Sequence, residues 1–264
     1  MNRFKIGILV IAIAAWMGCM GGHGGSEAAM DSAVAVDSTL GSEELGSSSD
    51  LSVLPDSTSD TPTEARMRKM GLVDVRELDP TICVHLVYAT PNNFMGEVLY
   101  DDIHKAFLLP AVAEKVVAAQ QALHVEHPDC DLLIWDAARP LSVQRKMFHR
   151  VAGTPQNIYV SNPAKGPGMH NLGAAVDVTI VDSLGRALPM GTKFDHFGEE
   201  SHIDYEEELL ASGRITQEEF DNRRLLRRLM DEQGMLSLYS EWWHFNLMPV
   251  EKARRTLEAI DFLN

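Results

Sequence analysis

The sequence has little positive charge, few cysteines and no long hydrophobic run. Its 23 Lys and Arg residues stand against 38 Asp and Glu residues, and the formal net charge is -15. This balance argues against nucleic-acid binding, which requires a basic stripe. The three cysteines lack the paired spacing of a thiolate zinc site. The longest apolar run, residues 6–16, is shorter than the roughly 20 residues that span a bilayer.

The first 19 residues have the pattern of an export signal. Arg3 and Lys5 precede the apolar run, whose length matches the core of a signal peptide, about 7–15 residues. Gly18 and Cys19 follow and resemble the cleavage site of a bacterial lipoprotein, although Trp16 stands where Leu is usual. We therefore expect residues 1–19 to be a lipoprotein-type signal peptide. Lipid on Cys19 would anchor the protein to a membrane on the periplasmic side of the cell envelope, with simple secretion and a retained anchor as alternatives.

An acidic segment separates this signal from the rest of the chain. Residues 20–62 hold eight acidic residues and no Lys or Arg, and they are rich in Gly, Ser and Ala. Such a composition buries too little apolar surface to fold. We expect residues 20–66 to be a flexible linker and residues 67–264 to form one domain, a length that is sufficient for a substantial core.

The expected domain mixes strand and helix patterns without a regular alternation. Strand patterns cover residues 73–90, 132–135, 174–181 and 236–247. Helix patterns cover residues 105–127, with Pro110 in the first turn, 140–151, and a stretch from the capping box of Thr216 and Glu219 to Gly234. This mixture favours an α+β fold with a central antiparallel or mixed sheet flanked by helices. Cys83 and Cys130 lie in apolar strand-like runs, where they could pair or remain free.

The segment from His170 to Asp177 has the composition of a metal site. If residues 174–181 form a strand, Val176, Val178 and Ile180 face the core, and Asp177 faces the other side with Ala175 and Thr179. Gly173 allows a sharp turn that returns His170 towards Asp177. An imidazole and a carboxylate that converge in this way are reasonable zinc ligands. The alternative is a turn followed by a half-buried strand with a surface Asp.

Two other segments carry residue types suited to chemistry. Glu241 and His244 flank two tryptophans whose rings can wall off a site. In a regular strand Glu241 and His244 face opposite sides, so a bulge near Glu241 is required if both serve one metal. Arg139 follows the strand pattern of residues 132–135, where it could hold a developing oxyanion or belong to a structural ion pair. An aromatic-rich core strand with a hydrogen-bonded His is the alternative for residues 241–244.

These motifs together resemble the VanX-type D-alanyl-D-alanine dipeptidases, a family of zinc peptidases. The pattern H-x-x-G-x-A-x-D from His170 is followed by E-W-W-H from Glu241. Further matching segments are Tyr88-Ala89-Thr90 with Asn93-Phe94 and Gly96, Arg139-Pro140, the run from Pro189 to Asp195, Ser201-His202 and Asn222-Arg223-Arg224. The resemblance covers roughly residues 75–250 and implies the fold of the zinc D-Ala-D-Ala peptidases.

The resemblance also implies roles for individual residues. One Zn²⁺ would be held by His170, Asp177 and His244. Glu241 would be the general base and Arg139 would stabilise the transition state, while Asp195, helped by Tyr88, would hold the free ammonium group of the substrate. The family commonly has Ser at the position of Gly168, so a hydroxyl that could bind substrate is missing here.

The expected activity is zinc-dependent hydrolysis of the small dipeptide D-Ala-D-Ala. One alternative is a D,D- or L,D-carboxypeptidase that acts on longer peptidoglycan stem peptides. Asp195 argues against it, because a carboxylate that binds the free ammonium group of a dipeptide would have no cationic partner in a longer peptide. A noncatalytic cell-wall-binding lipoprotein is a second alternative, but such a protein should have lost a metal ligand or the base.

Overall fold

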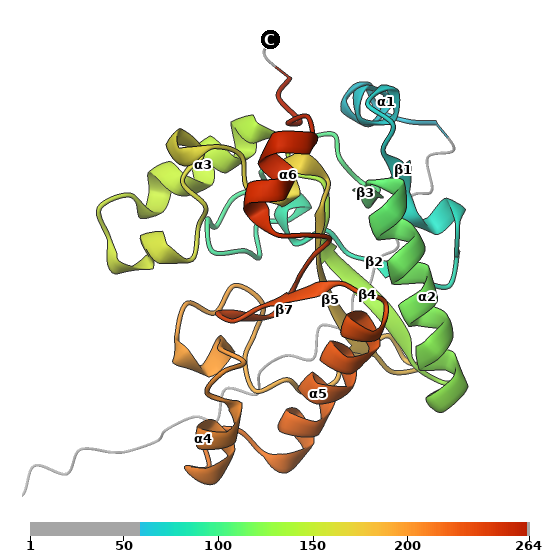
Figure 1. Cartoon of the computed structure of the whole chain (residues 1–264), viewed down its shortest axis with the longest axis vertical. Helices are drawn as coiled ribbons and strands as arrows, with labels where there is room; N and C mark the ends of the chain where they lie inside the picture. Colours follow the sequence, from blue (N-terminus) through green and yellow to red (C-terminus); the bar gives the residue numbers. More distant parts are fainter. Residues whose placement is uncertain (1–58, 263–264) are drawn as a thin grey trace, which may run out of the picture. The chain divides into compact units, whose positions relative to one another are not determined.

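A five-stranded mixed sheet lies at the centre of the described part of the chain (Figure 1). The structure is a computed structural model, and it describes residues 59–262. The strands are β2 (Cys83–Val84), β4 (Asp131–Asp136), β5 (Ala175–Val181), β7 (Glu241–Asn246) and β6 (Leu236–Leu238), in this spatial order. β2 runs parallel to β4, and the other neighbours are antiparallel. The predicted α+β fold with a mixed sheet is thereby confirmed.

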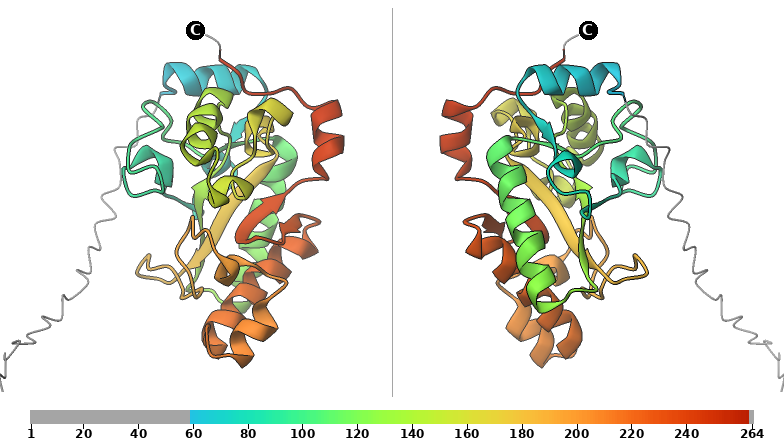
Figure 2. Two further views of the ribbon diagram at one scale, coloured as in Figure 1. Left: turned by 90° about the vertical axis from the view of Figure 1, so that its left-hand side faces the viewer. Right: turned by 90° about the vertical axis from the view of Figure 1, so that its right-hand side faces the viewer.

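Helices pack around this sheet. They are α1 (Pro62–Lys69), α2 (Pro110–Glu126), α3 (Leu141–Val151), α4 (Glu206–Ala211), α5 (Gln217–Glu232) and α6 (Val250–Thr256). α2 lies along one face of the sheet, where it contacts β4 and α5 (Figure 2). α5 begins at the predicted capping box, since the Thr216 hydroxyl accepts the backbone N–H of Glu219 and the Glu219 carboxylate accepts that of Thr216.

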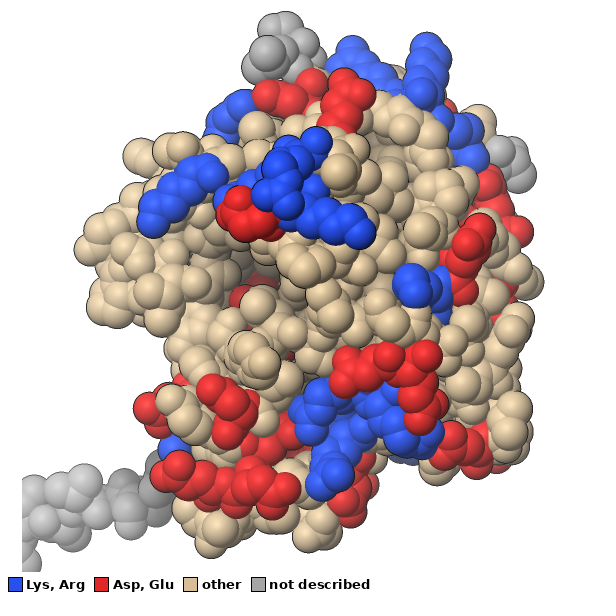
Figure 3. All heavy atoms as spheres, viewed as in Figure 1, with Lys and Arg blue, Asp and Glu red and all other residues tan. Residues whose placement is uncertain are grey.

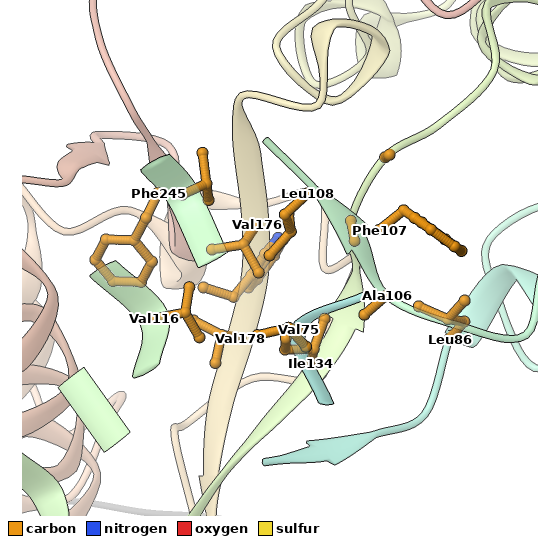
Figure 4. Close-up of a cluster of buried hydrophobic side chains, with 14 of the residues drawn as sticks. Val75, Leu86, Ala106, Phe107, Leu108, Val116, Ile134, Val176, Val178 and Phe245 are labelled. Atoms are coloured by element: carbon orange, nitrogen blue, oxygen red, sulfur yellow. The ribbon is translucent and has the colours of Figure 1, made fainter. Parts of the chain in front are cut away.

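The core lies between α2 and the sheet (Figure 4). Val116 of α2 packs near Ile134 of β4, Val178 of β5 and Phe245 of β7. Val176, Val178 and Ile180 belong to this core, as the alternation predicted. The opposite side of β5 is also covered, because all seven residues of the strand are buried. Asp177 is therefore not a surface residue.

Two predicted elements differ from the structure. Residues 73–90 were expected to be a strand region, but only β1 (Val73–Asp74) and β2 are strands there. Between and after them the chain forms 3-10 turns, the first of which is capped when the Asp74 carboxylate accepts the N–H of Arg76. The helix expected from residue 105 begins at Pro110, because β3 (Phe107–Leu108) pairs with β1 before the helix starts.

The folded domain also begins earlier than predicted. α1 starts at Pro62 behind a capping box of Thr61 and Glu64, so the expected linker up to residue 66 is wrong over residues 61–66. Glu64 fixes this helix to the domain by accepting the backbone N–H groups of His104 and Lys105 at 2.8 and 3.1 Å. The expected signal peptide with Cys19, and the linker up to residue 58, lie outside the described residues.

Two further findings concern residues 59–262. Cys83 and Cys130 are both free, which answers the pairing question that the sequence left open. Within this range no helix has the length and apolar character needed to cross a membrane.

Candidate active site

Three neighbouring strands bring polar residues into one row. Asp136 of β4 is the register partner of Asp177 of β5, and Asp177 is in turn the partner of His244 of β7. His170 reaches the same place from the 3-10 turn His170–Leu172 just before β5. Gly173 ends this turn with a φ of 63°, which is the sharp turn that its lack of a side chain predicted.

The side chains of His170, Asp177 and His244 converge on a common point. Nδ1 of His244 lies 2.8 Å from Oδ1 of Asp177, and Nε2 of His170 lies 3.3 Å from Oδ2 of the same carboxylate. The two imidazole nitrogens, Nε2 of His170 and Nδ1 of His244, are 3.1 Å apart. Tetrahedral zinc ligands about 2.0–2.1 Å from the metal are separated by roughly 3.3 Å. The spacing of these donor atoms therefore fits one zinc ion.

The outer nitrogens of both imidazoles have protein partners. Nδ1 of His170 donates to the carbonyl oxygen of Ala137 at 2.7 Å. Nε2 of His244 donates to Oδ1 of Asn246 at 2.9 Å. Each ring is thereby held in the tautomer whose inner nitrogen keeps a lone pair for a metal. Burial acts to raise the pKa of Asp177, but His170 and His244 together hold this pKa below its ordinary value.

Glu241 lies beside these ligands because β7 bulges. The register of β6 and β7 shifts, so that Ser237 pairs with Phe245 while its neighbour Leu238 pairs with Glu241. This irregularity is the bulge that the sequence required, and it brings Oε2 of Glu241 to 3.9 Å from Nδ1 of His244. Burial raises the pKa of Glu241 to about 7. The group can accordingly accept or release a proton near neutral pH.

Arg139 belongs to a buried ion pair and also lines the site. Its Nε donates to Oδ2 of Asp136 at 3.1 Å, and its Nη2 bonds to the same oxygen. Its Nη1 donates to Oε1 of Gln144 at 2.8 Å, and the guanidinium lies 5.1 Å from the centre of the Tyr88 ring. Asp136 is in turn fixed by the Tyr100 hydroxyl, which donates to Oδ1 at 2.6 Å.

Asp195 and Tyr88 lie together, as the resemblance implied. The Tyr88 hydroxyl donates to the Asp195 carboxylate, at 2.9 Å from Oδ1 and 3.1 Å from Oδ2. Asp195 has a φ of 60°, a backbone region that residues other than glycine rarely adopt. Burial raises the pKa of its carboxyl to about 7.

One cavity of about 270 Å³ joins all these groups. Its lining includes His170, Asp177, His244, Glu241, Arg139, Asp195 and Tyr88. Its volume is below the about 300–1,000 Å³ of pockets for drug-sized ligands, so it suits a small substrate. A hollow with acidic atoms on its floor is visible on the face shown in Figure 3.

Reasoning from the sequence missed the residues that support the site. Asp136, Gln144 and Tyr100 received no role, because their function depends on strand register and on contacts across the fold. The contact of Asn246 with His244 could have been predicted, because residues two apart in a strand lie on the same face of the sheet.

Comparison with known proteins agrees with this geometry. The chain is 32% identical over 180 residues to a D-alanyl-D-alanine dipeptidase of Escherichia coli, a match that covers 67% of this chain and 84% of that protein. It is 29% identical over 178 residues to a D-alanyl-D-alanine dipeptidase of Enterococcus faecalis, covering 61% and 83% of the two chains. The sequence profile of the Peptidase_M15 family, described as D-ala-D-ala dipeptidase, matches residues 68–260, and the chain therefore belongs to this peptidase family.

Proposed function

We propose that this protein is a zinc-dependent dipeptidase that hydrolyses D-Ala-D-Ala. The observation that carries the proposal is the convergence of His170, Asp177 and His244 in a small cavity that also holds Glu241. The relatives named D-alanyl-D-alanine dipeptidase support the same substrate.

The residues of the site divide the chemistry between them. A zinc ion held by the three ligands would polarise the scissile carbonyl group and acidify a water molecule. Glu241, whose burial raises its pKa to about 7, takes a proton from the water and delivers it to the leaving amine. Arg139 stabilises the negative charge that develops on the carbonyl oxygen. Its pair with Asp136 keeps the guanidinium in place for this role.

Asp195 sets the length of the substrate. It lines the cavity with Tyr88, and its ionised form is suited to bind the free ammonium group of a dipeptide. A stem peptide has an amide bond at this position, which would leave the buried carboxylate without a cationic partner. This favours the dipeptidase over a carboxypeptidase that trims longer wall peptides.

We also propose that the enzyme works in the cell envelope on dipeptides derived from the wall. The basis is the sequence of residues 1–19, which has the pattern of a lipoprotein signal with Cys19 as the lipidated residue. Membrane fractionation of cells that express wild-type protein or Cys19→Ala tests this proposal. Release of the variant from the membrane fraction is expected, and equal retention of both proteins would contradict the lipid anchor.

Hydrolysis assays test the proposed activity. The full chain, loaded with zinc, should release D-Ala from D-Ala-D-Ala, and a chelator should abolish the activity until zinc is restored. A stem pentapeptide should react far more slowly. Asp177→Ala should lose both bound zinc and activity, because it removes the ligand that both imidazoles contact. Chelator-resistant hydrolysis, or faster cleavage of the pentapeptide, would reject the proposal.

A further inference from the structure

The proposed function leaves one end of the substrate without a partner. A free dipeptide carries an ammonium group, which Asp195 is suited to hold, and a carboxylate at its other end. Two arginines line the cavity, Arg139 and Arg254. In the proposed mechanism Arg139 already serves the carbonyl oxygen, and its nitrogens also bond to Asp136 and Gln144. Arg254 is therefore the arginine of the lining that can pair with the substrate carboxylate.

Arg254 is held in place by a backbone hydrogen bond and has only a long contact to one exposed carboxylate. Its Nε donates to the carbonyl oxygen of Pro167 at 2.9 Å. The nearest carboxylate oxygen, Oε1 of Glu251, is 3.7 Å from Nη1 and belongs to an exposed side chain. Within residues 59–262 neither terminal nitrogen of Arg254 makes a hydrogen bond. Figure 3 shows Lys and Arg side chains, with acidic side chains among them, gathered over α6 beside the hollow.

Ser161 occupies the space next to Gly168. A Cβ atom added to Gly168 would lie 3.1 Å from both Cβ and Oγ of Ser161. A serine at position 168, which the family commonly has, would therefore crowd Ser161 and require it to shift. The backbone of Ser161 is fixed, because its carbonyl oxygen accepts from Nε2 of Gln144 at 2.8 Å. Its hydroxyl makes no hydrogen bond within the described residues and is free for a ligand.

A chain of four contacts connects Ser161 with the ammonium site. It runs from Asp195 to Tyr88 by the hydroxyl hydrogen bond and from Tyr88 to Arg139 by the guanidinium that lies over the ring. It continues from Arg139 to Gln144 and from Gln144 to Ser161 by hydrogen bonds. The residues at its two ends, Asp195 and Ser161, both line the cavity. Asp195 is suited to the ammonium group of a dipeptide, and the Ser161 hydroxyl can donate a hydrogen bond to its carboxylate.

We infer that Ser161 and Arg254 form the subsite for the carboxylate end of the dipeptide, and that Ser161 supplies the hydroxyl missing at Gly168. This inference rests on the proposed function. It assigns substrate binding to two residues outside the matched motifs. Arg254 provides charge and Ser161 a hydrogen bond, and a carboxylate accepts both.

The first test compares a charged with an uncharged substrate end. Arg254→Ala should raise the KM for D-Ala-D-Ala by roughly ten- to hundredfold, which is the range for a lost charged hydrogen bond. It should leave kcat nearly unchanged, because the bond is made in the ground state as well as in the transition state. The KM for D-Ala-D-Ala amide, which lacks the negative charge, should change little. Arg254→Lys should recover part of the loss, and Arg255→Ala, an exposed neighbour on α6, is the matched control.

The second test exchanges the serine between positions 161 and 168. Ser161→Ala should raise the KM for the dipeptide several-fold. Gly168→Ser alone should also impair binding, because its side chain needs the space of Ser161. Combining Gly168→Ser with Ser161→Gly should restore KM towards the wild-type value, so that the two changes are strongly non-additive.

The outcomes separate this inference from the proposed function. If the wild-type protein does not hydrolyse D-Ala-D-Ala, the proposed function is rejected and the subsite with it. If the wild-type protein is active but Arg254→Ala affects dipeptide and amide equally, or the serine exchange is simply additive, the subsite is rejected and the dipeptidase stands.

Discussion

Asp177 and His244 are register partners on adjacent strands, and Oδ1 of the first lies 2.8 Å from Nδ1 of the second. The sheet itself thus fixes two of the three proposed metal ligands relative to each other. The third, His170, comes from the turn just before β5 and is oriented by the Ala137 carbonyl group beyond β4. A rigid arrangement of this kind holds a metal without reorganisation of the ligands.

Asn246 should be required for tight zinc binding although it is not a ligand. Its Oδ1 accepts Nε2–H of His244, so Asn246→Ala frees the ring to rotate or to change tautomer. We expect zinc affinity to fall about 10- to 100-fold, the usual range for losing such a support. Competition with a chromophoric chelator measures it, with Asn157→Ala at an exposed position as the control. Unchanged affinity would show that His244 needs no orienting partner.

Glu241→Gln should separate metal binding from turnover. The amide keeps the size of the side chain but cannot accept a proton, so kcat should fall by about 10²- to 10⁴-fold. Zinc content should remain at one per chain, because Glu241 lies beside the ligand set rather than in it. Steady-state kinetics and metal analysis of the same sample check both expectations. Glu208→Gln, at an exposed position of α4, should leave kcat unchanged, and a Glu241→Gln enzyme with wild-type kcat would remove Glu241 from the mechanism.

Local patterns predicted the regular elements that their own residues determine. The capping box at Thr216 and the alternation of residues 174–181 correctly gave α5 and β5. The strand prediction for residues 73–90 was wrong because most of their buried apolar side chains come from 3-10 turns and loops, and only two short strands form there. The start of α1 was missed because the helix is short and its Glu64 is fixed by a loop 40 residues away in the sequence.

The sequence predicted only those residues of the site that belong to recognisable motifs. The residues proposed to carry metal-binding and acid–base chemistry stood in recognisable spacing, and the bulge near Glu241 followed from the need to combine it with His244. The role of Asp136 depends on the register of β4 against β5, which the sequence does not specify. Ser161 lies in a loop and Arg254 on a helix, and both line the cavity only because of how these elements pack. No local sequence pattern therefore predicted their position.

Asp136 should be essential for stability as well as for the position of Arg139. It is fully buried, and its removal leaves the buried guanidinium without a counter-charge. We expect Asp136→Ala to lower the free energy of unfolding by about 3–5 kcal/mol. Chemical denaturation measures the loss, and Asp261→Ala, which breaks the exposed pair with Arg145, should change the midpoint little.

A second variant distinguishes a lost charge partner from a lost packing volume. Replacing both partners, as in Asp136→Leu with Arg139→Met, removes the unpaired charge and should cost less than Asp136→Ala alone. If the double variant is less stable than the single one, the loss does not come from the unpaired guanidinium.

Dipeptide binding should depend on pH through Asp195. Burial raises the pKa of this carboxyl to about 7, so below that pH the group is neutral in the free enzyme and loses its attraction for the substrate ammonium. The α-amino group, with an ordinary pKa of about 7.7–8.0, stays charged between pH 5 and 7. The Kd for D-Ala-D-Ala should therefore rise nearly tenfold for each unit below about pH 7.

Calorimetry on the zinc-loaded Glu241→Gln variant measures this Kd. The variant removes both turnover and the titration of Glu241, whose pKa is also about 7. Asp195→Asn in the same background should bind weakly with a flat profile between pH 5 and 7, while its Tyr88 hydrogen bond can persist to the amide oxygen. A slope that survives in Asp195→Asn would assign the titration to another group and remove Asp195 as the ammonium anchor.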